Sequence, residues 1–250
     1  MKRTSKNDRT PLRSTEASAP RSAQAHYTDE ALAYAFTAEA LRVWASRWGC
    51  LGGHELWERE TRIVDPACGD GGLLWAAAHG VWAELAQTPK HRALRTSADA
   101  LATRVQSRLH GVDTRQDAVD AARAALPGAT FTCGDGLCAD ADGALVIMNP
   151  PWAGRSKRAP EVTAQIRQIT GEGTPDLAVA FLRAYPNARQ ISAILPKAVT
   201  EGDSLNAGLQ WMGANGWRVA SATTRRPWPG RASVLYVTVH LENLSSPLPP

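Results

Sequence analysis

Short apolar segments alternate with longer segments of helical periodicity along most of this chain. Strands are expected at 61–64, 110–112, 130–132, 144–148, 191–195, 218–222 and 233–240. Helices are expected at 29–48, 73–85, 93–109, 117–126, 177–185 and 205–215, and Thr28 is the candidate N-cap of the first. This alternation predicts an α/β fold with a mostly parallel sheet. The last two strands are too close together for a crossover helix, so they should form an antiparallel hairpin at one edge.

Polar side chains and glycines follow several of these strands. In such a fold, ligands bind outside the carboxyl ends of the strands. The first strand leads into the glycine-rich segment 65–72, where the backbone can turn and approach a ligand closely. The second strand ends at Asp113, and the third ends at Asp135 between two glycines. Gly71 and Asp113 are about twice as far apart as the roughly 20 residues of a dinucleotide-binding fingerprint, which argues against NAD.

The fourth strand ends in Asn149-Pro150-Pro151-Trp152, named here the Asn-Pro-Pro-Trp turn. Two consecutive prolines fix the backbone and offer carbonyl oxygens as acceptors, and the Asn149 side chain adds another acceptor. Together these oxygens could hold an exocyclic NH2 group by both of its hydrogens. Trp152 offers a flat face on which a planar base or amide can stack. The alternative is a purely structural turn, with Trp152 packed in the core.

The composition is that of a globular protein of one domain, with 250 residues, 44% hydrophobic and 21% charged. The net charge of +4 comes from residues 1–25, which hold six basic and two acidic side chains, while the rest of the chain is balanced. We expect 1–25 to be a disordered basic tail, either a solvated leader or a segment that contacts nucleic acid. Residues 244–250 are expected to be a disordered C-terminal end, which leaves 26–243 as the folded domain.

No apolar run approaches the roughly 20 residues that span a bilayer, and no secretory signal is present, so we expect a cytoplasmic protein without a membrane partner. The four cysteines form no CxxC pair, and the six histidines form no HxxxH pair. We therefore expect neither a metal site nor a disulfide.

Taken in order, the four strand ends resemble those of the amino-methyltransferases that use S-adenosylmethionine (SAM) and carry an Asn/Asp-Pro-Pro-aromatic motif. More narrowly, the chain resembles the N6-adenine DNA methyltransferases. Segment 65–74 is similar to the cofactor loop of that family, and Gly111-Val112-Asp113, followed by Ala118-Val119, is similar to its ribose-binding segment. His26-Tyr27-Thr28 resembles the Tyr-Thr-Pro motif that borders the cofactor, although Asp29 stands in place of the proline.

This resemblance covers about residues 26–240. It implies a Rossmann-like class I methyltransferase with a mostly parallel seven-stranded sheet and an antiparallel C-terminal hairpin. It also implies methyl transfer from SAM to the N6 amino group of adenine in DNA. The implied cofactor-binding residues are Tyr27, Thr28, Asp65, Ala67, Gly69, Gly71, Asp113 (ribose), Asp135 (adenine) and Asn149. The implied catalytic residues, which present the target nitrogen, are Asn149, Pro150, Pro151 and Trp152.

Two basic segments are candidates for contact with nucleic acid. They are Arg155, Lys157 and Arg158 after the Asn-Pro-Pro-Trp turn, and Arg225, Arg226 and Arg231 around Trp228 in the terminal hairpin. DNA-modifying members of the family add a target-recognition domain, and segment 153–175 is too short to be one. We therefore expect low sequence specificity, a specificity subunit or second copy as partner, or a substrate other than duplex DNA.

Three other functions share parts of this pattern. The same tetrapeptide occurs in enzymes that methylate RNA bases and in enzymes that methylate a glutamine amide of release factors. The sequence shows no separate N-terminal helical domain, which disfavours the glutamine substrate. A non-catalytic cofactor-binding subunit is a further alternative, but it would have no use for an intact Asn-Pro-Pro-Trp turn.

Overall fold

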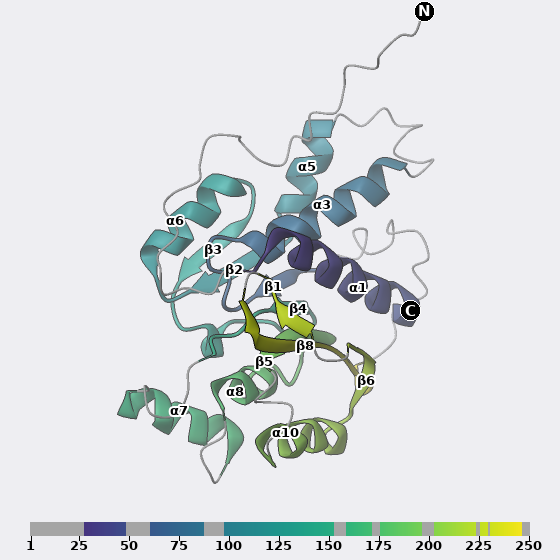
Figure 1. Ribbon diagram of the computed structural model, residues 1–250. Coiled ribbons are helices and arrows are strands. Elements are labelled where there is room, and N and C mark those ends of the chain that lie inside the picture. The colour runs from purple at the N-terminus through teal and green to yellow at the C-terminus, as the bar shows by residue number, and fades with distance from the viewer. Residues whose placement is uncertain are drawn as a thin grey trace, which may run out of the picture.

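The computed structural model describes residues 28–48, 61–87, 98–152, 159–171, 176–196, 203–223, 226–229 and 231–246 (Figure 1). These residues form an eight-stranded sheet of order β3-β2-β1-β4-β5-β8-β6, with β7 paired to β8 outside this path. The strands are β1 (Ile63–Asp65), β2 (Leu109–Asp113), β3 (Thr130–Cys133), β4 (Leu145–Met148), β5 (Gln190–Pro196), β6 (Trp217–Ala222), β7 (Arg226–Trp228) and β8 (Arg231–Asn243). The helices are α1 (Glu30–Trp48), α3 (Gly72–Gln87), α5 (Ala98–Gln106), α6 (Gln116–Ala125), the 3-10 helix η1 (Gly136–Cys138), α7 (Pro160–Thr170), α8 (Leu177–Arg183) and α10 (Asp203–Ala214).

The strand directions follow the sequence prediction. Neighbouring strands from β3 through β5 in the sheet are parallel, and β8 runs antiparallel to both β5 and β6. The predicted α/β fold with antiparallel C-terminal strands is therefore confirmed. The hairpin differs in detail, because β8 lies between β5 and β6 and the short strand β7 is added to it. A three-residue strand that contains Pro227 is too short to show alternation, and proline argues against a strand.

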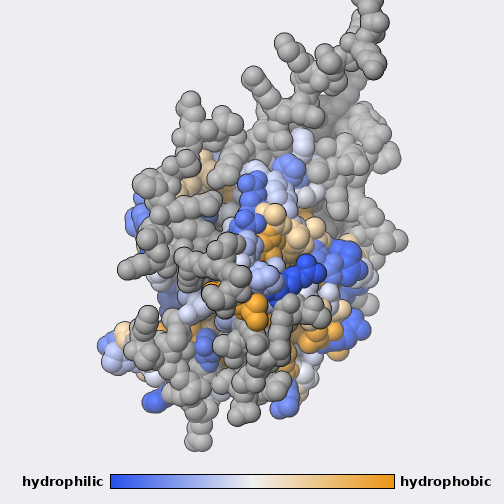
Figure 2. Space-filling model, viewed as in Figure 1, coloured by the Kyte–Doolittle hydropathy of each residue, from blue (hydrophilic) through white to orange (hydrophobic). Residues whose placement is uncertain are grey.

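Helices cover both faces of the sheet, with α1, α3 and α5 on one face and α7, α8 and α10 on the other (Figure 1). Each face has its own hydrophobic cluster, the first centred on α1 and α3 and the second on α8. Strands β4 and β5 are buried almost throughout, as expected for parallel strands covered on both faces. Figure 2 shows small hydrophobic areas between hydrophilic ones on one side of the molecule. Among the large apolar side chains of the described residues, those of Val219 and Leu244 are exposed, and most of the others are buried or partly buried.

Three elements differ from the sequence prediction. The N-cap of α1 is Asp29 rather than Thr28, because Asp29 Oδ1 accepts hydrogen bonds from the backbone N–H groups of Ala31 (3.0 Å) and Leu32 (3.3 Å). Helix α5 is shorter than the expected helix at 93–109, since residues 91–97 lie outside the described part and Leu109 already belongs to β2. Helix α7 was not expected, although Pro160 begins it and Gly171, with φ of 82°, ends it.

The domain boundaries remain predictions. The tail 1–25 and residues 247–250 lie outside the described part of the chain, and β8 ends at Asn243. In the part that is described, no helix has the length and apolar character that a membrane span needs. The same residues contain no group of three or more His, Cys, Asp or Glu side chains arranged to hold a metal ion.

Candidate active site

The sheet reverses its strand order at β1. Strand β1 pairs with β2 on one side and with β4 on the other, so the chain passes outward through β2 and β3 before it returns to β4. A crevice outside the carboxyl ends of the strands at such a point is where open α/β sheets bind ligands. Asp65 ends β1, and the Asn-Pro-Pro-Trp turn follows β4 directly. The two most distinctive segments of the sequence thus leave neighbouring strands.

The segment after β1, named here the glycine loop (Asp65–Gly72), is tied to the end of β2. The backbone N–H of Cys68 donates to the Val112 carbonyl, and that of Gly69 donates to Asp113 Oδ2, each at 2.9 Å. Gly71 has φ of 84°, a conformation that L side chains rarely adopt, and a Cβ there would lie 3.2 Å from Ala122 Cβ. The loop is therefore held close against both β2 and α6.

Asp65 is fully buried where β1 enters the glycine loop. Its Oδ1 accepts a hydrogen bond of 3.0 Å from the Ala67 N–H. Burial, with a smaller contribution from the negative charge of Asp113, raises the pKa of Asp65 to about 8, although the Ala67 hydrogen bond opposes this shift. A carboxyl group with so strongly raised a pKa next to a ligand crevice is a typical feature of functional sites.

Asp113 at the end of β2 uses both carboxylate oxygens locally. Oδ2 accepts from Gly69, and Oδ1 accepts from the Arg115 N–H at 2.9 Å. The Arg115 guanidinium also approaches Oδ1, with Nε at 3.7 Å. Because two carboxylate oxygens offer about four lone-pair sites, these contacts leave acceptor capacity for hydroxyl donors of a ligand.

Asp135, after β3, is the N-cap of η1 and is contacted by an amide side chain of α7. Its Oδ1 caps η1 by accepting from the Leu137 N–H at 3.0 Å, and its Oδ2 accepts from Gln165 Nε2 at 2.5 Å. The loop that carries Asp135 packs tightly on the glycine loop, because a Cβ at Gly136 would lie only 1.8 Å from the Pro66 carbonyl oxygen. The position of Asp135 is thus set by backbone contact with the glycine loop.

The Asn-Pro-Pro-Trp turn contacts two distant parts of the chain. Asn149 Nδ2 donates to Thr28 Oγ1 at 3.2 Å, just before α1. Trp152 is half-buried and meets Trp228 of β7 edge-on, with ring centroids 4.9 Å apart and an interplanar angle of 80°. Trp228 in turn meets Tyr236 of β8 at 5.7 Å and 81°. Trp152 is therefore packed against aromatic side chains and also partly exposed.

A pocket lies between the start of α1 and the start of α3. It is lined by Thr28, Glu30, Ala33, Asp70, Gly71, Gly72, Trp75, Ala76 and Ala125. Thr28 and Gly71 are predicted site residues, and Asp70 and Gly72 belong to the predicted cofactor loop, whereas Glu30 and Trp75 were not expected there. The start of α1 therefore lies across this pocket from the glycine loop.

Comparison with solved structures identifies the fold, although neither a scan of protein-family models nor a search of curated proteins finds a match. The DNA-bound type IIL restriction-modification enzyme MmeI is similar with a TM-score of 0.67 and 17% identity, over 88% of this chain and 37% of that one. A Listeria monocytogenes protein described as a class I SAM-dependent methyltransferase is similar with a TM-score of 0.54 and 14% identity, over 90% of this chain and 65% of that one. The DNA-bound type ISP restriction-modification enzyme LlaBIII gives a TM-score of 0.61 and 11% identity, over 89% and 19% of the two chains.

The chain has a Rossmann-like class I methyltransferase fold. It spans less than two thirds of the length of these similar chains.

The residues at the strand ends of this methyltransferase fold fit the parts of SAM. Asp113 retains acceptor capacity of the kind that ribose hydroxyls need. Asp135 Oδ2 already accepts from the NH2 group of Gln165, and the adenine amino group of SAM is a donor of the same kind. Buried Asp65, at the start of the glycine loop, supplies a carboxyl group. The positive charge of the ammonium group of SAM would favour the ionised form of this carboxyl group.

Six of the predicted site residues lie wholly or partly outside the described residues. Tyr27, Arg155, Lys157, Arg158 and Arg225 lie outside the described residues. Arg226 is exposed on β7, two residues before Trp228. Arg231 begins β8, and its side chain also lies outside the described part.

Sequence reasoning missed the contact between Gln165 and Asp135. The start and stop signals of α7, namely Pro160, Glu161 and Gly171, could have indicated that helix. No local pattern in the sequence shows that Gln165 of α7, which follows β4, contacts Asp135 after β3, since the two residues are 30 positions apart.

Proposed function

We propose that this protein is a SAM-dependent methyltransferase that methylates an exocyclic amino nitrogen, with N6 of adenine in DNA as its target. The observation that carries this proposal is the Asn-Pro-Pro-Trp turn at the end of β4, next to the glycine loop at the end of β1. The turn supplies acceptors for an NH2 group at the strand-order reversal where this fold binds ligands.

The residues that would hold SAM come from three adjacent strand ends. The glycine loop, with Asp65 at its start, would hold the methionine part, and Thr28 lies across the pocket from Gly71 and Gly72. Asp113 would accept from the ribose hydroxyls, and Asp135 would accept from the adenine amino group. When bound, SAM supplies a methyl group that its sulfonium already activates, so the protein mainly has to align the acceptor nitrogen.

Asn149 and Pro150 would act on the target nitrogen. An amino group conjugated to a ring is a poor nucleophile because its lone pair is delocalised. Acceptance of its two hydrogens by Asn149 Oδ1 and the Pro150 carbonyl oxygen favours tetrahedral geometry and directs the lone pair out of the ring plane. The proton leaves more easily after the nitrogen has gained the methyl group, so the mechanism requires no side-chain base with a shifted pKa.

Trp152 would stack on the target base. In a duplex, adenine must leave the helix to reach the Asn-Pro-Pro-Trp turn, which costs a few kcal/mol, and stacking on an aromatic side chain offsets part of this cost. Trp228 contacts Trp152 edge-on and is 7% exposed, so it would support the stacking side chain from behind.

One observation favours DNA as the substrate, and a second favours nucleic acid over protein. MmeI and LlaBIII, which share the fold, were solved with DNA. Arg226 is exposed close in sequence to Trp228, where it could contact a phosphate. We propose that a specificity subunit or a second copy of this chain reads the target sequence. In the absence of such a partner we expect low sequence specificity.

The proposal is tested by methyl transfer from labelled SAM to DNA, ribosomal RNA and a release factor, assayed in parallel. Products are digested and identified by mass spectrometry. We expect N6-methyladenine in DNA from the wild type and none from Asn149→Ala, which should still bind SAM. Asn187→Ala serves as the matched control, since Asn187 is exposed and its side chain bonds only to Asp142 among the described residues. Label in RNA or in glutamine alone would overturn the DNA substrate, and an active Asn149→Ala enzyme would overturn the catalytic role.

A further inference from the structure

The side chain of Asn149 is joined to the residue that precedes α1. Asn149 Nδ2 donates to Thr28 Oγ1 at 3.2 Å, across a sequence separation of 121 residues. Both side chains are half-buried, and Thr28 also lines the pocket beside the glycine loop. The contact links the end of β4 to the residue that precedes α1, the first helix of the chain.

An asparagine side chain has an acceptor at one end of its amide group and a donor at the other. A half-turn of the amide exchanges the two ends with little change in shape. The proposed mechanism needs Oδ1, the acceptor, to face the target amine. With Nδ2 directed to Thr28, the buried Oδ1 is the amide atom that the target amine would have to reach.

The position of Thr28 is fixed by α1, which is anchored along its length. Asp29 caps the helix, so Thr28 directly precedes the fixed first turn of α1. Phe36, Ala40 and Trp44 are almost completely buried against the core. A helix held in this way can act as a rigid support for Thr28.

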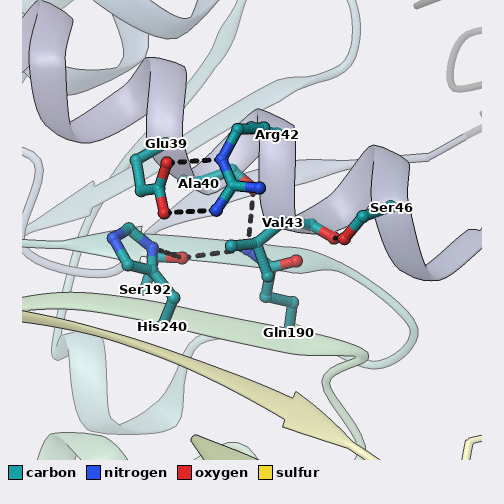
Figure 3. A network of polar contacts seen from close by, with 8 residues as sticks. All are labelled: Glu39, Ala40, Arg42, Val43, Ser46, Gln190, Ser192 and His240. Atoms are coloured by element: carbon teal, nitrogen blue, oxygen red, sulfur yellow. Dashed lines mark hydrogen bonds and ion pairs between the residues drawn. The ribbon is translucent and has the colours of Figure 1, made fainter. Parts of the chain in front are cut away.

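Polar contacts with the sheet add to this anchoring (Figure 3). Gln190 Nε2 of β5 donates to the Ala40 carbonyl oxygen at 2.8 Å and lies 3.0 Å from Ser192 Oγ. Ser192 Oγ is 2.9 Å from His240 Nδ1 of β8, and the ring of His240 stacks on Phe36 at 5.4 Å. Strand β5 therefore holds α1 by a hydrogen bond, and β8 holds it by ring stacking.

We infer that Thr28 is a positioning residue that orients the Asn149 amide for catalysis. This inference rests on the proposed function and assigns Thr28 a role other than the cofactor contact that the family resemblance implies. It accounts for the use of Asp29 as the N-cap, which leaves the Thr28 hydroxyl available for Asn149. A cofactor contact predicts that loss of the Thr28 hydroxyl weakens SAM binding, whereas a positioning role predicts that this loss lowers kcat. Measurements of Kd and kcat therefore separate the two roles.

Thr28→Val replaces the hydroxyl by a methyl group of similar size and removes the hydrogen bond. We expect kcat for methyl transfer to fall by about 10- to 100-fold, because a misplaced catalytic group can cost on the order of 100-fold. The Kd for SAM, measured by calorimetry, should stay within about threefold of wild type, less than the roughly fivefold change that corresponds to a typical net hydrogen bond. Thr28→Ser, which keeps the hydroxyl, should recover most of kcat.

Thr37→Val is the matched control, because Thr37 lies on the same helix and its hydroxyl bonds to the Ala33 carbonyl within that helix. It should leave kcat and the Kd for SAM unchanged. A Thr28→Val enzyme that binds SAM poorly but keeps its kcat would show a cofactor contact and overturn the inference. Unchanged kcat and Kd in Thr28→Val would overturn it as well.

A second measurement does not depend on activity. NMR of protein with 15N-labelled asparagine reports the side-chain NH2 signals, and Asn149→Ala identifies that of Asn149 by its loss. We expect Thr28→Val to shift this signal and Thr28→Ser to shift it much less. If the wild type transfers no methyl group to any substrate, the proposed function fails, and the NMR result still decides whether Thr28 orients Asn149. A signal that is the same in Thr28→Val and wild type would show that the contact is absent.

Discussion

Asp65 links the candidate site to the stability of the fold through the raised pKa of its buried carboxyl group. Its pKa is raised to about 8, mainly because burial penalises the ionised form. In the unfolded chain an aspartate ionises near pH 4. Between these values the folded chain therefore holds one proton more at this position than the unfolded chain does. By linkage, the free energy of unfolding must fall as pH rises through that range.

Replacement of Asp65 by Asn tests this at the residue scale. Asn keeps the shape and can still accept from the Ala67 N–H, but it does not titrate. Between about pH 5 and pH 7, the stability of wild type should fall relative to Asp65→Asn by roughly 1.4 kcal/mol per pH unit. Urea unfolding of both proteins at several pH values measures this difference. Parallel stability profiles would contradict the burial of an uncharged Asp65.

At the scale of elements, the decisive contact is between η1 and the glycine loop. Gly136 begins η1, and its backbone lies against the Pro66 carbonyl. Because Asp135 is its neighbour, this contact sets the distance between the ends of β1 and β3. The close approach requires glycine because there is no room for a Cβ at this position. The backbone conformation is not the reason, since the φ of Gly136 lies outside the left-handed range.

Gly136→Ala should therefore separate the two loops. Its Cβ would lie 1.8 Å from a backbone oxygen, so we expect a loss of about 2–3 kcal/mol or more of stability together with weaker SAM binding. Gly213→Ala in α10 is the matched control, because a Cβ there meets nothing within 4 Å. In a helix this control should stabilise the protein by roughly 0.5–1 kcal/mol. Thermal or urea unfolding measures both, and a harmless Gly136→Ala would refute the close contact.

At the scale of the whole molecule, the β7–β8 hairpin and the Asn-Pro-Pro-Trp turn form one continuous region. Trp228 of β7 packs on Trp152, and Arg226 is exposed two residues earlier on β7. If this region receives DNA, Arg226→Ala should weaken DNA binding by about two- to fivefold and reduce the slope of log affinity against log salt by about 1.

Arg104→Ala provides the control for the loss of one positive charge, since Arg104 is exposed on α5, away from the Asn-Pro-Pro-Trp turn. It should leave the salt slope unchanged. Fluorescence anisotropy with a labelled duplex at several salt concentrations measures both variants. Equal slopes for Arg226→Ala and wild type would exclude a phosphate contact at Arg226.

Most of the sheet was predictable because its strands are short apolar segments bounded by turn residues, as at 144–148 before Asn149. The places where β1, β2 and β4 end were predictable for the same reason. The contacts of Asp135 with Gln165 and of Asn149 with Thr28 were not, because they join segments far apart in sequence. Asp29 illustrates the limit: the sequence showed a departure from the family motif, and only the structure shows that Asp29 caps α1.

The account rests on the capacity of the Asn-Pro-Pro-Trp turn to present an amino nitrogen for methylation. The most direct test incubates DNA with the protein and SAM that carries a deuterated methyl group, and measures labelled N6-methyladenine by mass spectrometry. Wild type should produce it. Asn149→Ala should produce none while its Kd for SAM stays within about threefold of wild type, because Asn149 acts on the target amine. Deuterated methyl groups found only on other atoms, or made equally by Asn149→Ala, would contradict the account.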